Sequence, residues 1–230
     1  MCGRYSFTHT KEKFSKRFDI NISNWKPRYN VAPQQTVPVI TDANPTEASF
    51  FRWGLIPSWS LEENTGANLF NARTETIFTK APFKHAIRAQ RCLIPADGYF
   101  EWKREGKNRI PFRFMLASDE AFAFAGIWES WERKDGEIIN TCAIITTTAN
   151  TVVSEIHDRM PAILPKELER SWLKKDLKDH EITDMIKACD SNKITYYKAH
   201  KSVNDAGHDS LECIQVAPKI YPGESFSLFE

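Results

Sequence analysis

The chain has 230 residues, of which 41% are hydrophobic, 27% charged and 12% aromatic, and its formal net charge is +1. This length suits one large domain or two small ones, with burial of about 70–75% of the unfolded surface. The near-zero charge excludes a global basic field that attracts nucleic acid, so a nucleic-acid partner must be held by a local patch.

The first residues, Met1-Cys2-Gly3-Arg4, are the most informative part of the sequence. Methionine before a small side chain is normally removed after synthesis, which leaves Cys2 with a free α-amine beside its thiol. The usual pKa is about 7.7–8.0 for such an amine and about 8.5 for the thiol, so part of each group is nucleophilic near neutral pH. An aldehyde can react first with the amine and then with the tethered thiol, which closes a five-membered thiazolidine ring. Position 2 can also hold a cysteine that has no chemical role, and Cys2 alone does not distinguish between these two interpretations.

The other cysteines and the apolar segments indicate where the protein works. The five cysteines are scattered, odd in number and without CxxC spacing, which argues against a disulfide framework and a structural zinc site. The chain opens without an apolar signal core, and its longest apolar run, residues 121–128, is too short to span a membrane. We expect a cytoplasmic protein in a reducing compartment, with no metal and no organic cofactor.

The predicted elements begin with a short helix over residues 11–18, in which Phe14 and Phe18 share one face. The middle of the chain predicts two antiparallel hairpins, because β-branched and aromatic runs flank turns that contain glycine. Apolar residues three and four apart predict three further helices, and Pro165 fits the start of the second of these. The hairpins are expected at 99–102 with 110–116 and at 122–131 with 138–148, around turns at 105–108 and 134–136, and the helices at 81–89, 166–173 and 181–188.

These elements predict an α+β fold, because strands and helices are interspersed without the regular alternation of a doubly wound sheet. The sequence contains no internal repeat, low-complexity tract or obvious linker, so we expect a single domain over residues 1–230 whose last 25 or so residues are irregular. Residues 80–113 hold nine lysines and arginines against three acidic residues. That excess fits a solvated face as well as a binding face.

Three short segments carry more polar side chains than a scaffold needs. Taken singly, Asn71 could cap a turn, Glu101 could face solvent and His157 could be a hydrogen-bonded core histidine. Arg73 follows Asn71 by two residues, and extended backbone places such side chains on the same side. The same spacing separates His157 from Arg159, so each pair is expected to face one cleft. The segments are residues 71–76, 95–102 and 156–161.

Seven short motifs lie in order between residue 1 and about residue 165. They are MCGRY (1–5), PRYNVAP (27–33), WGLIPSW (53–59), NARTET (71–76), RCLIPADGYFEW (91–102), FAGIWE (124–129) and IHDRMP (156–161). In these motifs the chain resembles the SRAP-domain family of abasic-site DNA–protein crosslinkers. The resemblance implies a single compact α+β domain around a curved, barrel-like antiparallel sheet with flanking helices and a positively charged cleft.

The resemblance also implies a reaction and the residues that perform it. Once Met1 is removed, the amine and sulfur of Cys2 join the aldehyde at C1′ of an abasic site, and the crosslink shields the lesion in the DNA damage response. Asn71 orients Cys2 or the sugar by hydrogen bonds. Glu101 acts as general acid and base around Schiff-base formation. His157 transfers a second proton, which assists opening of the sugar ring and reversal of the crosslink.

Single-stranded DNA that contains abasic sites is the implied partner, bound by a monomer that associates with the nucleoid when it acts on DNA. Arg73 and Arg159 hold the flanking phosphates through their planar guanidinium groups. Arg4 is a third candidate contact because it lies close to Cys2. Trp53 and Trp102 are candidates for base stacking, which contributes about 1–3 kcal/mol per base, and core packing is the alternative for each.

Other function classes also fit the first residues. Class II glutamine amidotransferases begin with Met-Cys-Gly and use the freed cysteine as a nucleophile whose own amine is the base. A thiol peptidase could pair Cys2 with His157, and removal of Met1 by the protein itself or hydrolytic release of the adduct would belong to that activity. A third alternative is a non-catalytic single-strand binding module in which Cys2 is incidental.

Overall fold

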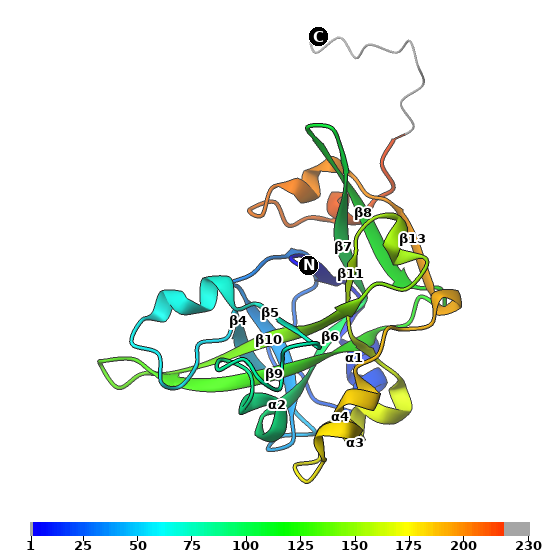
Figure 1. Ribbon diagram of the computed structural model, residues 1–230. Helices are drawn as coiled ribbons and strands as arrows, with labels where there is room; N and C mark the ends of the chain where they lie inside the picture. The colour runs from blue at the N-terminus through cyan, green and yellow to red at the C-terminus, as the bar shows by residue number, and fades with distance from the viewer. Residues whose placement is uncertain (1, 219–230) are drawn as a thin grey trace.

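The computed structural model describes residues 2–218, which fold around two β-sheets (Figure 1). The smaller sheet has five strands in the order β13-β8-β7-β1-β2, and every neighbouring pair in it is antiparallel. Its strands are β1 (Tyr5–Phe7), β2 (Arg28–Val31), β7 (Gly98–Glu105), β8 (Asn108–Leu116) and β13 (Ile194–Lys198).

The larger sheet has eight strands, and five of them close into a ring. The order is β11-β10-β4-β3-β6-β9-β12, with β5 beside β10, and β9 pairs back onto β10. The pairings of β10 with β4 and β5 are parallel, and the others are antiparallel. The strands are β3 (Thr36–Thr41), β4 (Ser49–Trp53), β5 (Asn71–Arg73), β6 (Arg91–Ala96), β9 (Phe122–Glu132), β10 (Ile138–Thr148), β11 (Arg159–Pro161) and β12 (Ile163–Leu164).

Both predicted hairpins are confirmed, and with them the α+β class and the barrel-like sheet. The first joins β7 to β8 through a turn in which Glu105 lies opposite Asn108. Gly106 in this turn has a φ of +59°, a conformation that costs glycine little. The second joins β9 to β10, with Ile138 opposite Glu132.

Of the predicted helices, only the first has the expected bounds. Helix α1 (Lys11–Phe18) buries Phe14 and Phe18, and the Thr10 side chain accepts a hydrogen bond from Lys13 N. Over 81–89 only α2 (Ala86–Ala89) is helical, and turns occupy residues 81–85. The other helical segments are a 3₁₀ turn over 166–168 followed by α3 (Glu169–Trp172), and α4 (Asp179–Met185), which begins and ends earlier than expected.

The irregular C-terminal segment is confirmed as far as residue 218, and residues 219–230 lie outside the described part of the chain. Within 199–218 the regular elements are two 3₁₀ turns, over 201–204 and 211–214. This segment packs on the outer face of the five-stranded sheet, where Phe100, Val203 and Cys213 form a small second core. Between residues 2 and 218, no helix is long and apolar enough to cross a membrane.

A buried ion pair lies where the chain passes from one sheet to the other. Asp97 connects β6 to β7, and its Oδ1 accepts hydrogen bonds from Ser6 Oγ at 2.8 Å and from Arg113 NH2 at 3.0 Å. All three side chains are buried. Gly98 leaves room for the guanidinium group, because a Cβ at this position would lie 2.7 Å from Arg113 Nε. The network therefore fixes β1, β7 and β8 against one another.

Removing Arg113 is expected to destabilise the protein strongly. In Arg113→Ala the Asp97 carboxylate stays buried without its cation, which typically costs about 3–5 kcal/mol of unfolding free energy. Urea denaturation measures this loss. The control is Lys103→Ala at an exposed position of β7, which should stay within about 0.5 kcal/mol of the wild type. Equal stabilities of the two variants would contradict the role given to the ion pair.

Candidate functional site

The N-terminal segment brings Cys2 to the edge of β7. Strand β1 pairs with β7 through Tyr5 opposite Tyr99, and Phe100 N donates to Arg4 O at 3.0 Å. This register carries the chain before β1 along β7 toward Glu101. The Cys2 side chain is fully buried, with its Sγ 3.8 Å from Arg4 O.

Asn71 fixes the backbone of Cys2. Its Nδ2 donates a hydrogen bond to Cys2 O at 2.8 Å, from the first position of the short strand β5. Its Oδ1 is buried and accepts no hydrogen bond from the described residues 2–218. A buried acceptor without a donor is costly, so this oxygen is suited to a donor on a bound molecule or on a neighbouring amine.

Glu101 and His157 form the titratable pair of the site. Glu101 Oε2 lies 3.8 Å from His157 Nε2, and the Glu101 side chain is 3% exposed. Burial raises the pKa of Glu101 from the usual 4.5 to about 7. The carboxyl group is therefore protonated in a large fraction of molecules at neutral pH and can act both as acid and as base.

The hydrogen bonds of His157 indicate which ring nitrogen carries the proton. Arg159 N donates to Nδ1 at 3.0 Å, so in the neutral ring the proton is on Nε2, which faces Glu101. Burial lowers the pKa of His157, which favours this neutral form. The exposed Asp158 carboxylate also lies 3.0 Å from Nδ1, and it can accept a hydrogen bond there only when the ring is protonated.

One expectation about Cys2 is corrected by its surroundings. Burial, and then the charge of Glu101, raise the pKa of the Cys2 thiol far above its usual value. The thiol is therefore protonated near neutral pH, and the expected thiolate fraction is absent in this environment. A nucleophilic role for the sulfur requires a nearby base to take its proton, and Glu101 is the group whose charge Cys2 senses most strongly.

Two buried tyrosines lie near enough to Cys2 to be coupled to it electrostatically, and they were not among the site residues expected from the sequence. The hydroxyl groups of Tyr5 and Tyr99 have no hydrogen-bond partner among residues 2–218. Burial raises the pKa of both, and the charge of Cys2 contributes in each case. Their position in the motifs MCGRY and GYFEW is the signal that could have identified them.

The two predicted phosphate ligands have different environments. Arg73 is exposed and shares β5 with Asn71, as the spacing predicted. Arg159 is buried at the start of β11 and forms a bidentate ion pair with Glu75 (NH1 to Oε1, and NH2 to Oε2 at 3.1 Å). A phosphate contact by Arg159 would have to replace Glu75, so this role stays a prediction.

Arg4 is also engaged with protein. Its NH1 donates to Asn30 Oδ1 at 3.0 Å and to Val203 O at 2.7 Å, and its guanidinium lies over the Trp102 ring, 5.9 Å from the centroid. Asn30 is fully buried and also donates to carbonyl oxygens of Asp205 and His208. Arg4 therefore anchors the C-terminal segment, a role that the sequence analysis did not assign.

The two candidate stacking tryptophans differ in exposure. Trp53 is fully buried in β4, packs at 5.2 Å between ring centroids from Tyr5, and donates from Nε1 to Phe70 O at 2.8 Å. It has no face to offer a base, so the stacking role expected for Trp53 is wrong and its core alternative holds. Trp102 is half-buried, and its Nε1 donates to Asn204 Oδ1 at 2.6 Å.

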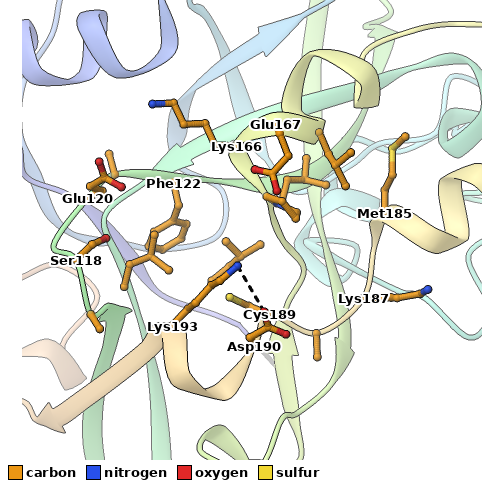
Figure 2. A pocket seen from close by; sticks show the side chains of 18 of the residues that line it. Ser118, Glu120, Phe122, Lys166, Glu167, Met185, Lys187, Cys189, Asp190 and Lys193 are labelled. Atoms are coloured by element: carbon orange, nitrogen blue, oxygen red, sulfur yellow. Dashed lines mark ion pairs between the residues drawn. The ribbon is translucent and has the colours of Figure 1, made fainter.

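A cavity of about 550 Å³ opens elsewhere in the molecule, and none of the candidate site residues line it (Figure 2). Its apolar floor includes Phe122 and Met185. Charged groups on its rim pair with each other, as Lys193 does with Asp190 at 3.4 Å. The cavity therefore lacks the converging titratable groups of the Cys2 site. Residues 2–218 contain no cluster of three or more acidic, histidine or cysteine side chains able to hold a metal ion.

Comparisons with known sequences place this site in context. The profile of a family described as "SOS response associated peptidase (SRAP)" matches residues 1–206. The chain is 37% identical over 222 residues to abasic site processing protein YoqW of Bacillus subtilis (strain 168), which covers 94% of this chain and 99% of the relative. It is 31% identical over 224 residues to abasic site processing protein HMCES of Gallus gallus, which covers 83% of this chain and 66% of the relative.

Solved structures agree with the fold described above. The X-ray structure of a protein from Bacteroides thetaiotaomicron matches with a TM-score of 0.84 at 33% identity, over 94% of this chain and 100% of the other. A protein from Bordetella bronchiseptica matches with a TM-score of 0.78 at 25% identity, over 86% of this chain and 100% of the other. The two-sheet architecture is thus shared over nearly the whole described chain.

Glu101 is expected to make the folded protein less stable as the pH rises. The raised pKa means that the folded state binds this proton more tightly than the unfolded state, so stability is lost between about pH 4.5 and pH 7. The loss is about 3 kcal/mol at 1.36 kcal/mol per pH unit. Glu101→Gln removes it, so the variant should gain about 2–3 kcal/mol relative to the wild type between pH 5 and pH 8, measured by urea denaturation.

His157 acts in the opposite direction, because its lowered pKa costs stability as the pH falls below 6.5. This contribution is present in both proteins and cancels in the comparison. Glu105→Gln at an exposed position of the same strand is the control, expected to change stability by less than about 0.5 kcal/mol at either pH. A difference between Glu101→Gln and wild type that does not change with pH would contradict the assignment.

Proposed function

Because this chain belongs to the SRAP family, we propose that it processes abasic sites in single-stranded DNA by forming a covalent thiazolidine between Cys2 and the sugar aldehyde. The observation that carries the proposal is the meeting of Cys2 with Asn71, Glu101 and His157 at one edge of β7. Two relatives of this chain, YoqW and HMCES, are named abasic site processing proteins.

The reaction begins at the amine that removal of Met1 would create on Cys2. The neutral amine adds to the aldehyde carbon C1′ and gives a carbinolamine. The protonated carboxyl of Glu101 donates its proton to the departing hydroxyl group, water leaves, and an iminium ion remains beside the Glu101 carboxylate. The Cys2 thiol then gives its proton to Glu101 as sulfur adds to the iminium carbon. Glu101 returns to its protonated form, and one water is lost overall.

The neighbouring residues support these steps. Asn71 holds the Cys2 carbonyl, and its buried Oδ1 can accept a hydrogen bond from the amine or from a sugar hydroxyl. His157 presents Nε2 toward Glu101, and its imidazolium form can pass a proton to the sugar oxygen as the sugar ring opens, which returns the imidazole to its neutral form. Arg73, exposed on the same strand as Asn71, is the first candidate for a flanking phosphate. We propose that the protein acts as a monomer.

The family description also names a peptidase. Within this proposal that activity is removal of Met1 by the protein itself, and lyase-type chemistry is hydrolytic release of the adduct by reversal of the same steps. Both would use Glu101 and His157, whose side chains lie 3.8 Å apart in the site. The alternative of a glutamine amidotransferase predicts ammonia release from glutamine, which separates it from the proposed reaction.

The adduct is expected to depend on the Cys2 amine and thiol together. Untagged protein, shown by mass spectrometry to lack Met1, should form with abasic single-stranded DNA a heat-resistant band on a denaturing gel. Its mass should equal protein plus DNA minus one water. Cys2→Ala, and a variant with glycine inserted between Met1 and Cys2, should give no band. Cys189→Ala, which removes a half-buried thiol outside the site, should react normally. Absence of an adduct with the trimmed wild type would overturn the proposal.

Loss of the acid should slow this reaction without unfolding the protein. General acid–base groups typically contribute about 10²–10⁴-fold, so Glu101→Gln should slow adduct formation by at least about 100-fold at pH 7. His157→Ala should slow it less, because the carboxyl group remains. Quenched time courses on denaturing gels measure both rates, and cooperative urea unfolding verifies the folds. Wild-type rates in Glu101→Gln would remove the role given to this residue.

A further inference from the structure

The β7–β8 hairpin carries arginines that the proposed site does not use. It extends past the body of both sheets, at the top of Figure 1, and Arg104 and Arg109 on it are exposed. Neither forms an ion pair with a carboxylate of residues 2–218, whereas Arg88 and Arg133, which are also solvent-accessible, pair with Asp179 and Glu63. Within the basic excess over residues 80–113, Arg88, Arg91 and Arg113 are therefore paired or buried, and Arg104 and Arg109 of this hairpin are exposed without a carboxylate partner in the described part of the chain.

The register of the hairpin places these two arginines directly opposite each other. Arg104 pairs with Arg109 across the antiparallel ladder, on the same face as Trp102. Like charges directly opposite destabilise a sheet. The repulsion between the two arginines therefore does not stabilise the folded protein. An anion bound between the two guanidinium groups would attract both of them and turn this repulsion into a net attraction.

Trp102 orients one of the two arginines. The guanidinium of Arg109 lies 5.7 Å from the Trp102 ring centroid, and the ring is itself fixed by the hydrogen bond from Nε1 to Asn204. A cation held over an aromatic ring keeps its N–H groups free at the edge of the plane. The arginine is therefore positioned before any ligand binds, which lowers the entropy cost of binding.

The hairpin also begins at the reacting groups. Trp102 directly follows Glu101 and points to the opposite face of β7, and Arg104, on the Trp102 face, lies three residues beyond Glu101, about 10 Å away at 3.4 Å per residue. That distance is about three nucleotides at 3.4 Å each along a stacked strand. Strand β1 covers the edge of β7 only as far as Phe100. A DNA strand whose abasic sugar is at Cys2 can therefore cross this edge farther along β7 and reach the Trp102–Arg104 face with a nearby phosphate.

We propose that the Trp102–Arg104–Arg109 face of the hairpin binds the phosphodiester backbone of the DNA strand on one side of the abasic site. This inference rests on the proposed function. The two guanidinium groups make charge-assisted hydrogen bonds to phosphate oxygens, and the bound phosphate offsets their mutual repulsion. Binding by the hairpin is independent of base sequence and sensitive to salt.

The test compares Arg104→Gln/Arg109→Gln with Lys13→Gln/Lys16→Gln, which removes the same charge from exposed positions of α1. Binding of intact single-stranded DNA is measured by fluorescence anisotropy between 50 and 200 mM salt. Loss of two phosphate contacts should reduce the magnitude of the slope of log K against log salt by about 1.4. The ratio of the wild-type binding constant to that of the variant should therefore fall about sevenfold as the salt rises over this range. The control pair should keep the wild-type slope, and equal slopes in both variants would overturn the proposal.

A purely structural role for the two arginines predicts a different result. Removing like charges that face each other should leave the thermal unfolding midpoint of Arg104→Gln/Arg109→Gln unchanged or raise it. A lowered midpoint together with an unchanged salt slope would show that the pair serves the fold and not DNA. The expected combination is weaker, less salt-dependent binding by a protein that is at least as stable.

The position of the contact is tested with abasic oligonucleotides that extend on only the 5′ or only the 3′ side of the lesion. The deficit of Arg104→Gln/Arg109→Gln should appear with one of them, and equal deficits with both would contradict the one-sided placement. At saturating protein both variants should still form the adduct. If the wild type forms no adduct but the salt slopes of the two variants differ as expected, the proposed function is wrong and the phosphate contact of the hairpin still holds.

Discussion

The buried contact between Asp97 and Arg113 determines how the two sheets of this protein meet. Asp97 occupies the single residue between β6, in the closed ring, and β7, in the five-stranded sheet. Its carboxylate also accepts from Ser6, so the first strand of the chain is held at the same corner. Because β1 is fixed there, the residues before it have one course available, along β7 toward Glu101. The position of Cys2 is thus a consequence of an ion pair that takes no part in the chemistry.

Burial gives the site its chemical character, and it acts on each group in a different way. At neutral pH the carboxyl of Glu101 keeps its proton in a large fraction of molecules, the thiol of Cys2 keeps its own, and the His157 ring favours its neutral form. All three shifts favour the neutral form, as expected where water is excluded. A site of neutral groups cannot attract DNA by charge, but it can move a proton between neighbours at little cost. In the proposed reaction, the attraction of DNA must therefore come from residues outside this pocket, and its covalent capture from the residues within it.

The sequence predicted the long elements and the identity of the chemical groups, for reasons that particular residues make clear. The two hairpins follow from long β-branched runs around Gly106 and Gly136, signals that act locally. Strands β1, β5 and β11 are three residues each, too short for any periodicity, and they exist because longer strands pair with them. Trp53 was misjudged because burial of one aromatic depends on contacts distant in sequence, and the ion pair of Arg159 with Glu75 spans 84 residues.

The distribution of partners among the arginines explains how a chain with a net charge of +1 can approach a polyanion. Arg17 and Arg113 are neutralised by buried carboxylates, and they serve the fold. Arg104 and Arg109 face each other instead, beside an aromatic ring that orders one of them. The repulsion between these two guanidinium groups is not compensated within the folded protein, and a phosphate bound between them would neutralise it. Local concentration of unneutralised charge, rather than net charge, is therefore the quantity that determines where a strand can approach this protein.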